Sequence, residues 1–360
     1  MPFNMPRPYD LETPCLALDL DRFDANVQSM VATCRRHGVA WRPHAKCHKS
    51  PIIARWLIDA GANGITCATV REVEMMADAG VRDLLLANMV AGALKLQRLA
   101  RAARQSDVIV CIDHLEQAQQ LAAVAESTDV TFRILIELEI GLRRVGVIPD
   151  DRVIRLAQQI RSTPRLEFSG LMAYEGHLLT IDDPGEKLRA IRAALGPVTE
   201  LKHQLVAEGL PCPIVSCGGT GSYPITVQIP GITEVQAGGA IFMDAFYRDK
   251  CQISELQNAL TVVSTVVSRP SPDRAVIDAG RKAMNIEIHP PQVLDWPGVT
   301  VAWLSAEHGV LHLTDESSSL SIGQQVRLVP GYADLTNILH SCFYGFRQGR
   351  LEQIIPIVRD

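Results

Sequence analysis

The feature that most constrains the fold of this chain is a regular alternation of strand-like and helix-like segments over its first two thirds. The apolar runs that predict strands are GVAWRPHAK, GITCATV, DLLLANM, DVIVCID, TFRILIELE, LEFSGLMAY, PIVSCGG and ITEVQAG. Amphipathic segments such as REVEMMADAG and DRVIRLAQQIRS lie between most of these runs. Several runs are almost continuously apolar, which is typical of strands covered on both faces. Eight strands with intervening helices predict a (β/α)8 TIM-type barrel.

The pattern changes after about Lys250. Short apolar runs and turns follow, with almost no helical period, and they predict a mainly β domain. The segment TPCLALDL, at 13–20, predicts one more strand ahead of the barrel. We therefore expect a barrel domain over 21–250 and a β domain built from 1–20 and 251–360.

Composition narrows the class of partner. The net charge is −5 among 360 residues, and no basic stripe with interleaved aromatic residues is present, so we expect no nucleic-acid partner. No apolar run is long enough to span a bilayer, and the first residues carry no apolar core for export, so we expect no membrane partner. Nine cysteines are scattered without CxxC pairs, which favours a reduced compartment. These features predict a cytoplasmic protein that acts on a small molecule.

The segment RPHAKCHK, from Arg42 to Lys49, holds one Arg, two Lys and two His. It follows the first predicted barrel strand, and barrel active sites form at the strand C-termini. Burial and neighbouring cations both lower the pKa of an amine and so make a lysine reactive towards an aldehyde. We expect Lys46 to point into the cavity as such an amine, and Lys49 to be a solvated residue at a helix start.

Other polar residues follow later strands of the predicted barrel. They are Glu137, Glu139, Arg143, Arg144, Tyr174, Glu175 and His177. The loop CGGTGSY, at 217–223, combines three glycines with the hydroxyls of Thr220 and Ser222, and it follows the seventh strand, where barrels often bind phosphate. It matches neither GxxxxGK[ST] nor GxGxxG, which disfavours a nucleotide. A phosphate anchor and a reactive lysine together predict a phosphorylated aldehyde cofactor.

Several motifs along nearly the whole chain carry a family resemblance. They are RPHAKCHKS, the run at 137–147, AYEG, SCGGTGSY, EVQAGGAIFMD, VIDAGRKA, SAEHGV and LVPGYAD. In this order they resemble the fold-type III pyridoxal-phosphate enzymes of the D-threonine aldolase and D-serine dehydratase group. The resemblance implies an alanine racemase-like barrel with pyridoxal 5′-phosphate (PLP) joined to Lys46 as a Schiff base. It also implies a homodimer in which the second subunit's β domain helps to close the site.

The resemblance further assigns roles to individual residues. Arg144 and Tyr174 would contact the cofactor ring, and Gly219, Thr220, Gly221 and Ser222 would hold its phosphate. His308, in AEHG, would be an acid/base group or a substrate contact. His177 is a second candidate for proton transfer, although a loop histidine with only a structural role fits the same position. The segment DDPGEK, at 182–187, is expected to be a solvated loop.

The chain departs from the family at the metal site. The aldolases and dehydratases carry His-x-Asp or His-x-Cys after the VPG turn, as ligands for a divalent metal (Mn, Mg or Zn). Here Asp334 stands at the acid position, but Tyr332 replaces the histidine. A lone carboxylate is a poor divalent site, and a neutral phenol does not substitute for imidazole. His340 and Cys342 have strand spacing, but we expect them to belong to a packed strand.

Bond cleavage at the amino-acid Cα is the chemistry that these residues predict. The resemblance favours a lyase of the aldolase type, which cleaves D-3-hydroxy amino acids such as D-threonine or D-3-hydroxyaspartate to glycine and an aldehyde. A dehydratase of the D-serine type and a metal-independent racemase are alternatives that use the same lysine. A non-catalytic PLP-binding protein is a more remote alternative, because the β domain would enclose a substrate cavity.

Overall fold

The structure, a computed structural model, describes residues 7–314 and 319–359 and divides into two compact units. The barrel unit comprises Met30–Lys46 and Ile53–Gly238. The β unit comprises the described parts of Met1–Ser29, Cys47–Ile52 and Gly239–Asp360. The domain limits expected from the sequence, with a barrel over 21–250, stay a prediction.

An eight-stranded parallel sheet forms the centre of the barrel unit. In chain order its strands are β2 (Ala40–Trp41), β3 (Ile65–Cys67), β4 (Asp83–Leu86), β5 (Asp107–Ile112), β6 (Phe132–Leu138), β7 (Leu166–Ala173), β8 (Ile214–Cys217) and β9 (Glu234–Val235). The spatial order is β2-β9-β8-β7-β6-β5-β4-β3. The two end strands meet, since His44, just after β2, forms a bridge with Thr66 of β3, and the Thr66 N–H donates to Pro43 O at 3.0 Å. The sheet is therefore closed into a barrel.

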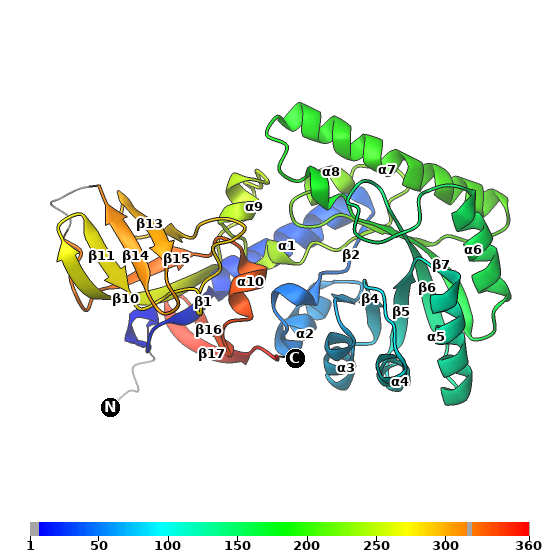
Figure 1. The fold of residues 1–360 in the computed structure, drawn as a ribbon, viewed down its shortest axis with the longest axis horizontal. Helices are drawn as coiled ribbons and strands as arrows, with labels where there is room; N and C mark the ends of the chain where they lie inside the picture. Colours follow the sequence, from blue (N-terminus) through cyan, green and yellow to red (C-terminus); the bar gives the residue numbers. More distant parts are fainter. Residues whose placement is uncertain (1–6, 315–318, 360) are drawn as a thin grey trace. The chain divides into compact units, whose positions relative to one another are not determined.

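Helices alternate with these strands along the chain. They are α1 (Leu20–His37), α2 (Pro51–Ala60), α3 (Val70–Asp78), α4 (Ala93–Ala102), α5 (Leu115–Thr128), α6 (Asp151–Ser162), α7 (Pro184–Ala207) and α8 (Tyr223–Thr226). Figure 1 shows α3 to α6 following one another along the outside of β4 to β7. Side chains from four of these strands pack inside the sheet, and they are Leu85, Ile109, Cys111, Leu135 and Met172. This layer of fully covered residues explains the near-continuous apolar runs in the sequence.

The expectation of a solvated loop at 182–187 is wrong. Asp183 is the N-cap of α7, its side chain accepts a hydrogen bond from the Glu186 N–H at 2.6 Å, and Pro184 occupies the first turn. An acidic N-cap followed by proline is a strong helix-start signal. Lys187 is buried, so this segment is the ordered start of a 24-residue helix.

A nine-stranded sheet forms the β unit, and in it β1 pairs with β10 and β16. Its strands are β1 (Cys15–Asp19), β10 (Leu260–Ser271), β11 (Arg274–Ile277), β12 (Gln292–Val293), β13 (Val299–Leu304), β14 (Gly309–Leu313), β15 (Gln325–Val329), β16 (Cys342–Arg347) and β17 (Arg350–Pro356). Two short helices, α9 (Ala245–Asp249) and α10 (Ala333–Asn337), lie in the same unit. The predicted class, a (β/α)8 barrel with a mainly β domain, is confirmed. Within the described ranges, no helix combines the length and the apolarity that crossing a membrane needs.

Candidate active site

Lys46 lies in a single 3-10 turn, Ala45–Cys47, just after the first barrel strand. Its backbone N–H donates to His44 Nδ1 at 3.3 Å, and its side chain is exposed. The sequence predicted a strand over the whole run GVAWRPHAK, but only Ala40–Trp41 and the bridge at His44 are paired. Beyond β2 the Arg42 N–H still donates to Val235 O at 2.9 Å and the His44 N–H to Gln236 O at 3.2 Å, and the chain turns only after His44. The turn places Lys46 at the C-terminal rim of the barrel.

Two of the basic neighbours expected to lower the pKa of the Lys46 amine are not available as free cations. Arg42 is 1% exposed, and its guanidinium pairs with Glu234 at 3.0 Å and with Asp83 at 2.6 Å. Asp83 and Glu234 are the first residues of β4 and β9, so this network lies at the opposite end of the barrel. His48 is buried, and burial lowers its pKa to about 3, so its imidazole is neutral at pH 7.

The end of β6 carries an ion pair. Arg144 Nη2 lies 3.2 Å from Glu137 Oε1, and the Arg144 backbone N–H donates to Glu139 Oε2 at 3.2 Å. Burial raises the pKa of Glu137, and the neighbouring guanidinium opposes that shift. Among the described residues, Glu137 Oε2 has no hydrogen-bond partner. Glu137 thus holds the half-exposed guanidinium of Arg144 at the strand end, while Glu139 holds the Arg144 backbone.

Tyr174 directly follows β7, and its ring lies beside the loop that follows β8. A Cβ placed on Gly219 would lie 3.0 Å from Tyr174 Cε2 and 3.1 Å from its hydroxyl. His177, in the 3-10 turn Gly176–Leu178, lies against Gly141, where any added side chain would clash with its imidazole. The loops after β6, β7 and β8 therefore meet at one rim, as the parallel strands require.

Glu175 organises the glycine-rich loop, a role that the sequence did not reveal. Its side chain is fully buried, with Oε2 accepting from the Gly218 N–H at 3.2 Å and Oε1 accepting from the Thr226 hydroxyl at 2.5 Å. The residue joins the start of the loop to α8. Its place after a strand in AYEG was visible, but nothing in a single sequence distinguishes a buried acid from a solvated one.

Thr220 supplies the observation that bears most directly on a ligand. Its side chain is 2% exposed, and its Oγ1 has no hydrogen-bond partner within the described residues. A buried hydroxyl left unpaired costs about 1–3 kcal/mol. Ser222 is also buried, and its Oγ accepts from the Gly219 N–H at 3.1 Å. The loop thus carries a hydroxyl donor poised for an acceptor that the polypeptide does not provide, which fits an anionic group.

The remaining predicted site residues belong to the β unit. His308 is exposed in the turn between β13 and β14, where its backbone N–H donates to Ser305 Oγ at 3.2 Å. The Tyr332 hydroxyl donates to Asp334 Oδ2 at 3.1 Å, and Asp334 is buried. His340 lies just before β16, so the expected strand includes Cys342 but not His340, whose Nε2 lies 2.8 Å from Ala283 O.

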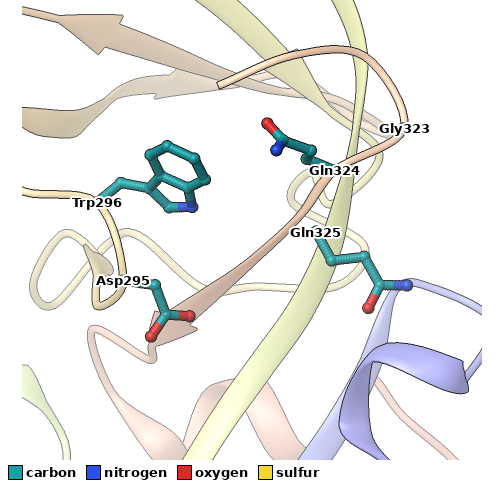
Figure 2. Close-up of a pocket in the computed structure, with 5 residues that line it drawn as sticks. All are labelled: Asp295, Trp296, Gly323, Gln324 and Gln325. Carbon is teal, nitrogen blue, oxygen red and sulfur yellow. The ribbon is translucent and has the colours of Figure 1, made fainter. Parts of the chain in front are cut away.

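The β unit also contains a pocket of about 430 Å³, lined by Asp295, Trp296, Gly323, Gln324 and Gln325 (Figure 2). Asp295 is the only acid in this lining, and its carboxylate pairs with Arg327 at 2.6 Å. The other groups are an indole, two amides and a glycine. The lining contains neither a nucleophile nor an acid/base pair, so this pocket has no catalytic constellation.

Comparisons with known proteins agree with this arrangement. Residues 18–245 match the family described as alanine racemase, N-terminal domain, and residues 259–346 match a serine dehydratase domain family. The chain is 36% identical to D-threonine aldolase of an Arthrobacter species, over 96% of this chain and 92% of the relative. It is 34% identical to 3-hydroxy-D-aspartate aldolase of Paracoccus denitrificans, over 97% of this chain and 92% of the relative.

A solved structure of D-threonine aldolase from Filomicrobium marinum superposes with a TM-score of 0.93 at 34% identity. The superposition covers 98% of this chain and 97% of that one. The resemblance inferred from the sequence motifs is therefore confirmed. The chain belongs to the alanine racemase-like family that includes D-threonine aldolase and 3-hydroxy-D-aspartate aldolase.

Proposed function

We propose that this protein is a PLP-dependent lyase that cleaves D-3-hydroxy amino acids by an aldolase reaction. The observation that carries the proposal is the rim of the barrel unit, where Lys46 and a glycine-rich loop with the unpartnered Thr220 hydroxyl follow parallel strands. The substrate class comes from the relatives, two of which are named for D-threonine and 3-hydroxy-D-aspartate. The products would be glycine and an aldehyde.

The residues at this rim fit PLP. Lys46 would supply the amine that binds the cofactor aldehyde, and Thr220, Gly221 and Ser222, with Gly219, would donate to its phosphate. Arg144 and Tyr174 would contact the ring. When bound, PLP supplies a conjugated ring that accepts the electron pair released at the substrate Cα.

The protein's own side chains would then place and move protons. Aldol cleavage removes the proton of the β-hydroxyl, breaks the Cα–Cβ bond with its electron pair going to Cα, and returns a proton to Cα. A base and an acid of the protein must therefore lie within hydrogen-bond distance of the substrate. Lys46, His177 and His308 are the candidates, and the imidazoles of His177 and His308 are exposed.

Dehydration is the second candidate. The chain is 31% identical to D-threo-3-hydroxyaspartate dehydratase of a Delftia species, over 91% of this chain and 92% of the relative. A dehydratase would use the same lysine but would remove the Cα proton and then expel the β-hydroxyl, giving a keto acid and ammonia. Racemisation is a third outcome, in which the Cα proton returns on the other face.

The experiment is a substrate panel on the PLP-loaded protein. D-Threonine, D-serine and D-3-hydroxyaspartate would be offered, with L-threonine as the stereochemical control. Aldehyde and glycine from D-threonine would support the aldolase, keto acid would support the dehydratase, and a change in enantiomer alone would support the racemase. If none of the three D-substrates gives an aldehyde or a keto acid, both lyase assignments are refuted.

We also propose a cytoplasmic homodimer. All nine cysteines are free thiols and eight are buried, which suits a reducing compartment. The dimer is implied by the family resemblance. Size-exclusion chromatography with light scattering would measure the molar mass of the protein in solution. A mass of one chain would refute it.

A further inference from the structure

Strand β15 ends at Val329, and Pro330 and Gly331 then lead into Tyr332 and Asp334 of the β unit. Family resemblance implies a divalent metal here, held by a histidine and an acid two residues apart. We infer that this chain does not use that metal site, because a phenol that donates a hydrogen bond to the acid has replaced the imidazole ligand.

The contacts of Tyr332 hold its side chain in one orientation. The residue is the N-cap of α10, in extended backbone conformation, and its hydroxyl donates to Asp334 Oδ2 at 3.1 Å. Its ring centre lies 5.7 Å from that of Phe246 and 5.8 Å from that of Tyr247, both edge-on. Edge-to-face packing of this kind fixes ring orientation. The hydroxyl is therefore directed at one of the two carboxylate oxygens with which Asp334 would bind a metal.

The neighbouring donors do not form an alternative cation site. Asp244 is buried close by, but its Oδ1 accepts from the Tyr247 N–H at 2.8 Å and its Oδ2 accepts from the Ala333 N–H at 2.9 Å. Both of its oxygens hold α9 and α10 in place. Across residues 7–314 and 319–359, no three His, Cys, Asp or Glu side chains gather closely enough to hold a metal. Divalent ions need several imidazole, thiolate or carboxylate ligands, and one hydrogen-bonded acid does not supply them.

The test measures metal directly. Wild type, Tyr332→His and Tyr332→Phe would be dialysed against EDTA and then against MnCl2, and bound manganese would be counted per chain. We expect wild type and Tyr332→Phe to retain well below one ion. Tyr332→His creates the His-x-Asp pair, so we expect it to bind manganese at least about 10-fold more tightly than wild type. Adding Asp334→Asn to that variant should abolish the gain.

Tyr332→Phe is the matched control, because it keeps the ring packing on Phe246 and Tyr247 and removes only the hydroxyl. Thermal unfolding of each variant establishes that it is folded before binding is measured. The inference would be overturned if wild type binds one manganese ion per chain and the Asp334→Asn change removes that ion. A folded Tyr332→His protein that binds no more manganese than wild type would also overturn it, because the phenol would then not be the deciding residue.

A consequence for catalysis rests on the proposed function. Cleavage of D-threonine by the PLP-loaded wild type should be unchanged, within about 2-fold, after EDTA treatment and after manganese is restored. A fall of 10-fold or more that manganese reverses would count against the inference. The manganese titrations need no substrate, so they stand even if D-threonine is not cleaved, and the two failures are distinguishable.

Discussion

The carboxyl group of Glu175 and the hydroxyl of Thr226 are joined by a 2.5 Å hydrogen bond in the interior of the barrel unit. The other oxygen of Glu175 accepts from the Gly218 N–H, so a single buried side chain connects the glycine-rich loop to α8. The conformation of this loop therefore depends on a residue from the preceding strand end. Its removal should affect both stability and ligand binding.

Glu175→Gln should lower the free energy of unfolding by about 1–2 kcal/mol, because an amide keeps one acceptor oxygen and leaves one of the two donors without a partner. Urea unfolding of the cofactor-free protein measures this change. Glu167→Gln is the control, since Glu167 is an exposed residue of β7, and it should shift stability by less than about 0.5 kcal/mol. Equal effects of the two changes would contradict the organising role of Glu175.

Thr220→Val should weaken PLP binding by about 10-fold while leaving the stability of the cofactor-free protein unchanged or slightly raised. The reason is that the Thr220 hydroxyl is buried without a partner in the described residues, so its removal has no cost until an anion is bound. Cofactor titration followed by absorption gives the affinity. Thr226→Val provides the contrast, because its hydroxyl is already bonded and its loss should reduce stability. Unchanged PLP affinity in Thr220→Val would argue against a phosphate at this loop.

Lys46→Ala should abolish the visible absorption of the loaded enzyme and lower the cleavage rate by roughly 10³-fold or more, since no other amine would bind the cofactor aldehyde. Borohydride reduction followed by peptide mass mapping should find the cofactor on the peptide that contains Lys46 in wild type. Lys49→Ala, three positions on, should keep both absorption and activity. If the cofactor is found on Lys49 instead, the assignment of the reactive amine to Lys46 is wrong.

His48 should make stability depend on pH. Burial lowers its pKa in the folded protein to about 3, whereas an unfolded histidine titrates near 6.5, so the unfolded state binds more protons between these values. Stability should therefore fall as pH drops below 6.5, by about 1.4 kcal/mol per unit, or roughly 2 kcal/mol from pH 7 to pH 5. His48→Asn keeps an acceptor for the Ser50 N–H, whose bond to His48 Nδ1 is 3.0 Å.

The measurement is chemical unfolding of wild type and His48→Asn at both pH values. The two proteins should differ in their pH slopes by about the amount that the histidine contributes, because all other groups titrate in both. Parallel slopes would mean that His48 titrates alike in the folded and the unfolded protein, so that burial does not lower its pKa.

Much of the fold was predictable, because strand content follows from local patterns. Runs such as DVIVCID and TFRILIELE are apolar on both faces and became β5 and β6, and their order along the chain determined the closed parallel sheet. The rim position of Lys46 and of Thr220 followed from the same pattern. The site could be outlined because both residues lie within a few positions of a strand end, Lys46 after β2 and Thr220 after β8.

The predictions that were wrong concern residues whose charge depends on burial or on partners far away in the sequence. The sequence places Arg42 among the cations beside the reactive amine, but Glu234, 192 positions later, accepts hydrogen bonds from its guanidinium. His48 is a basic residue by type, but complete burial lowers its pKa and keeps its imidazole neutral. The helix start at Asp183 and Pro184 differs, because an acidic N-cap followed by proline is a local signal that the sequence itself contains.

The Arg42–Glu234 pair lies on the seam where the first and last strands of the barrel meet, β2 beside β9. During synthesis, a ribosome that has not yet passed residue 234 leaves that cation without one of its two counter-charges and leaves β2 without its neighbour. In the emerging chain, the first barrel strand therefore stays unpaired with β9 until almost the entire barrel sequence has been translated. Premature termination inside this stretch would yield a fragment with an open sheet edge, a natural target for chaperones and proteases.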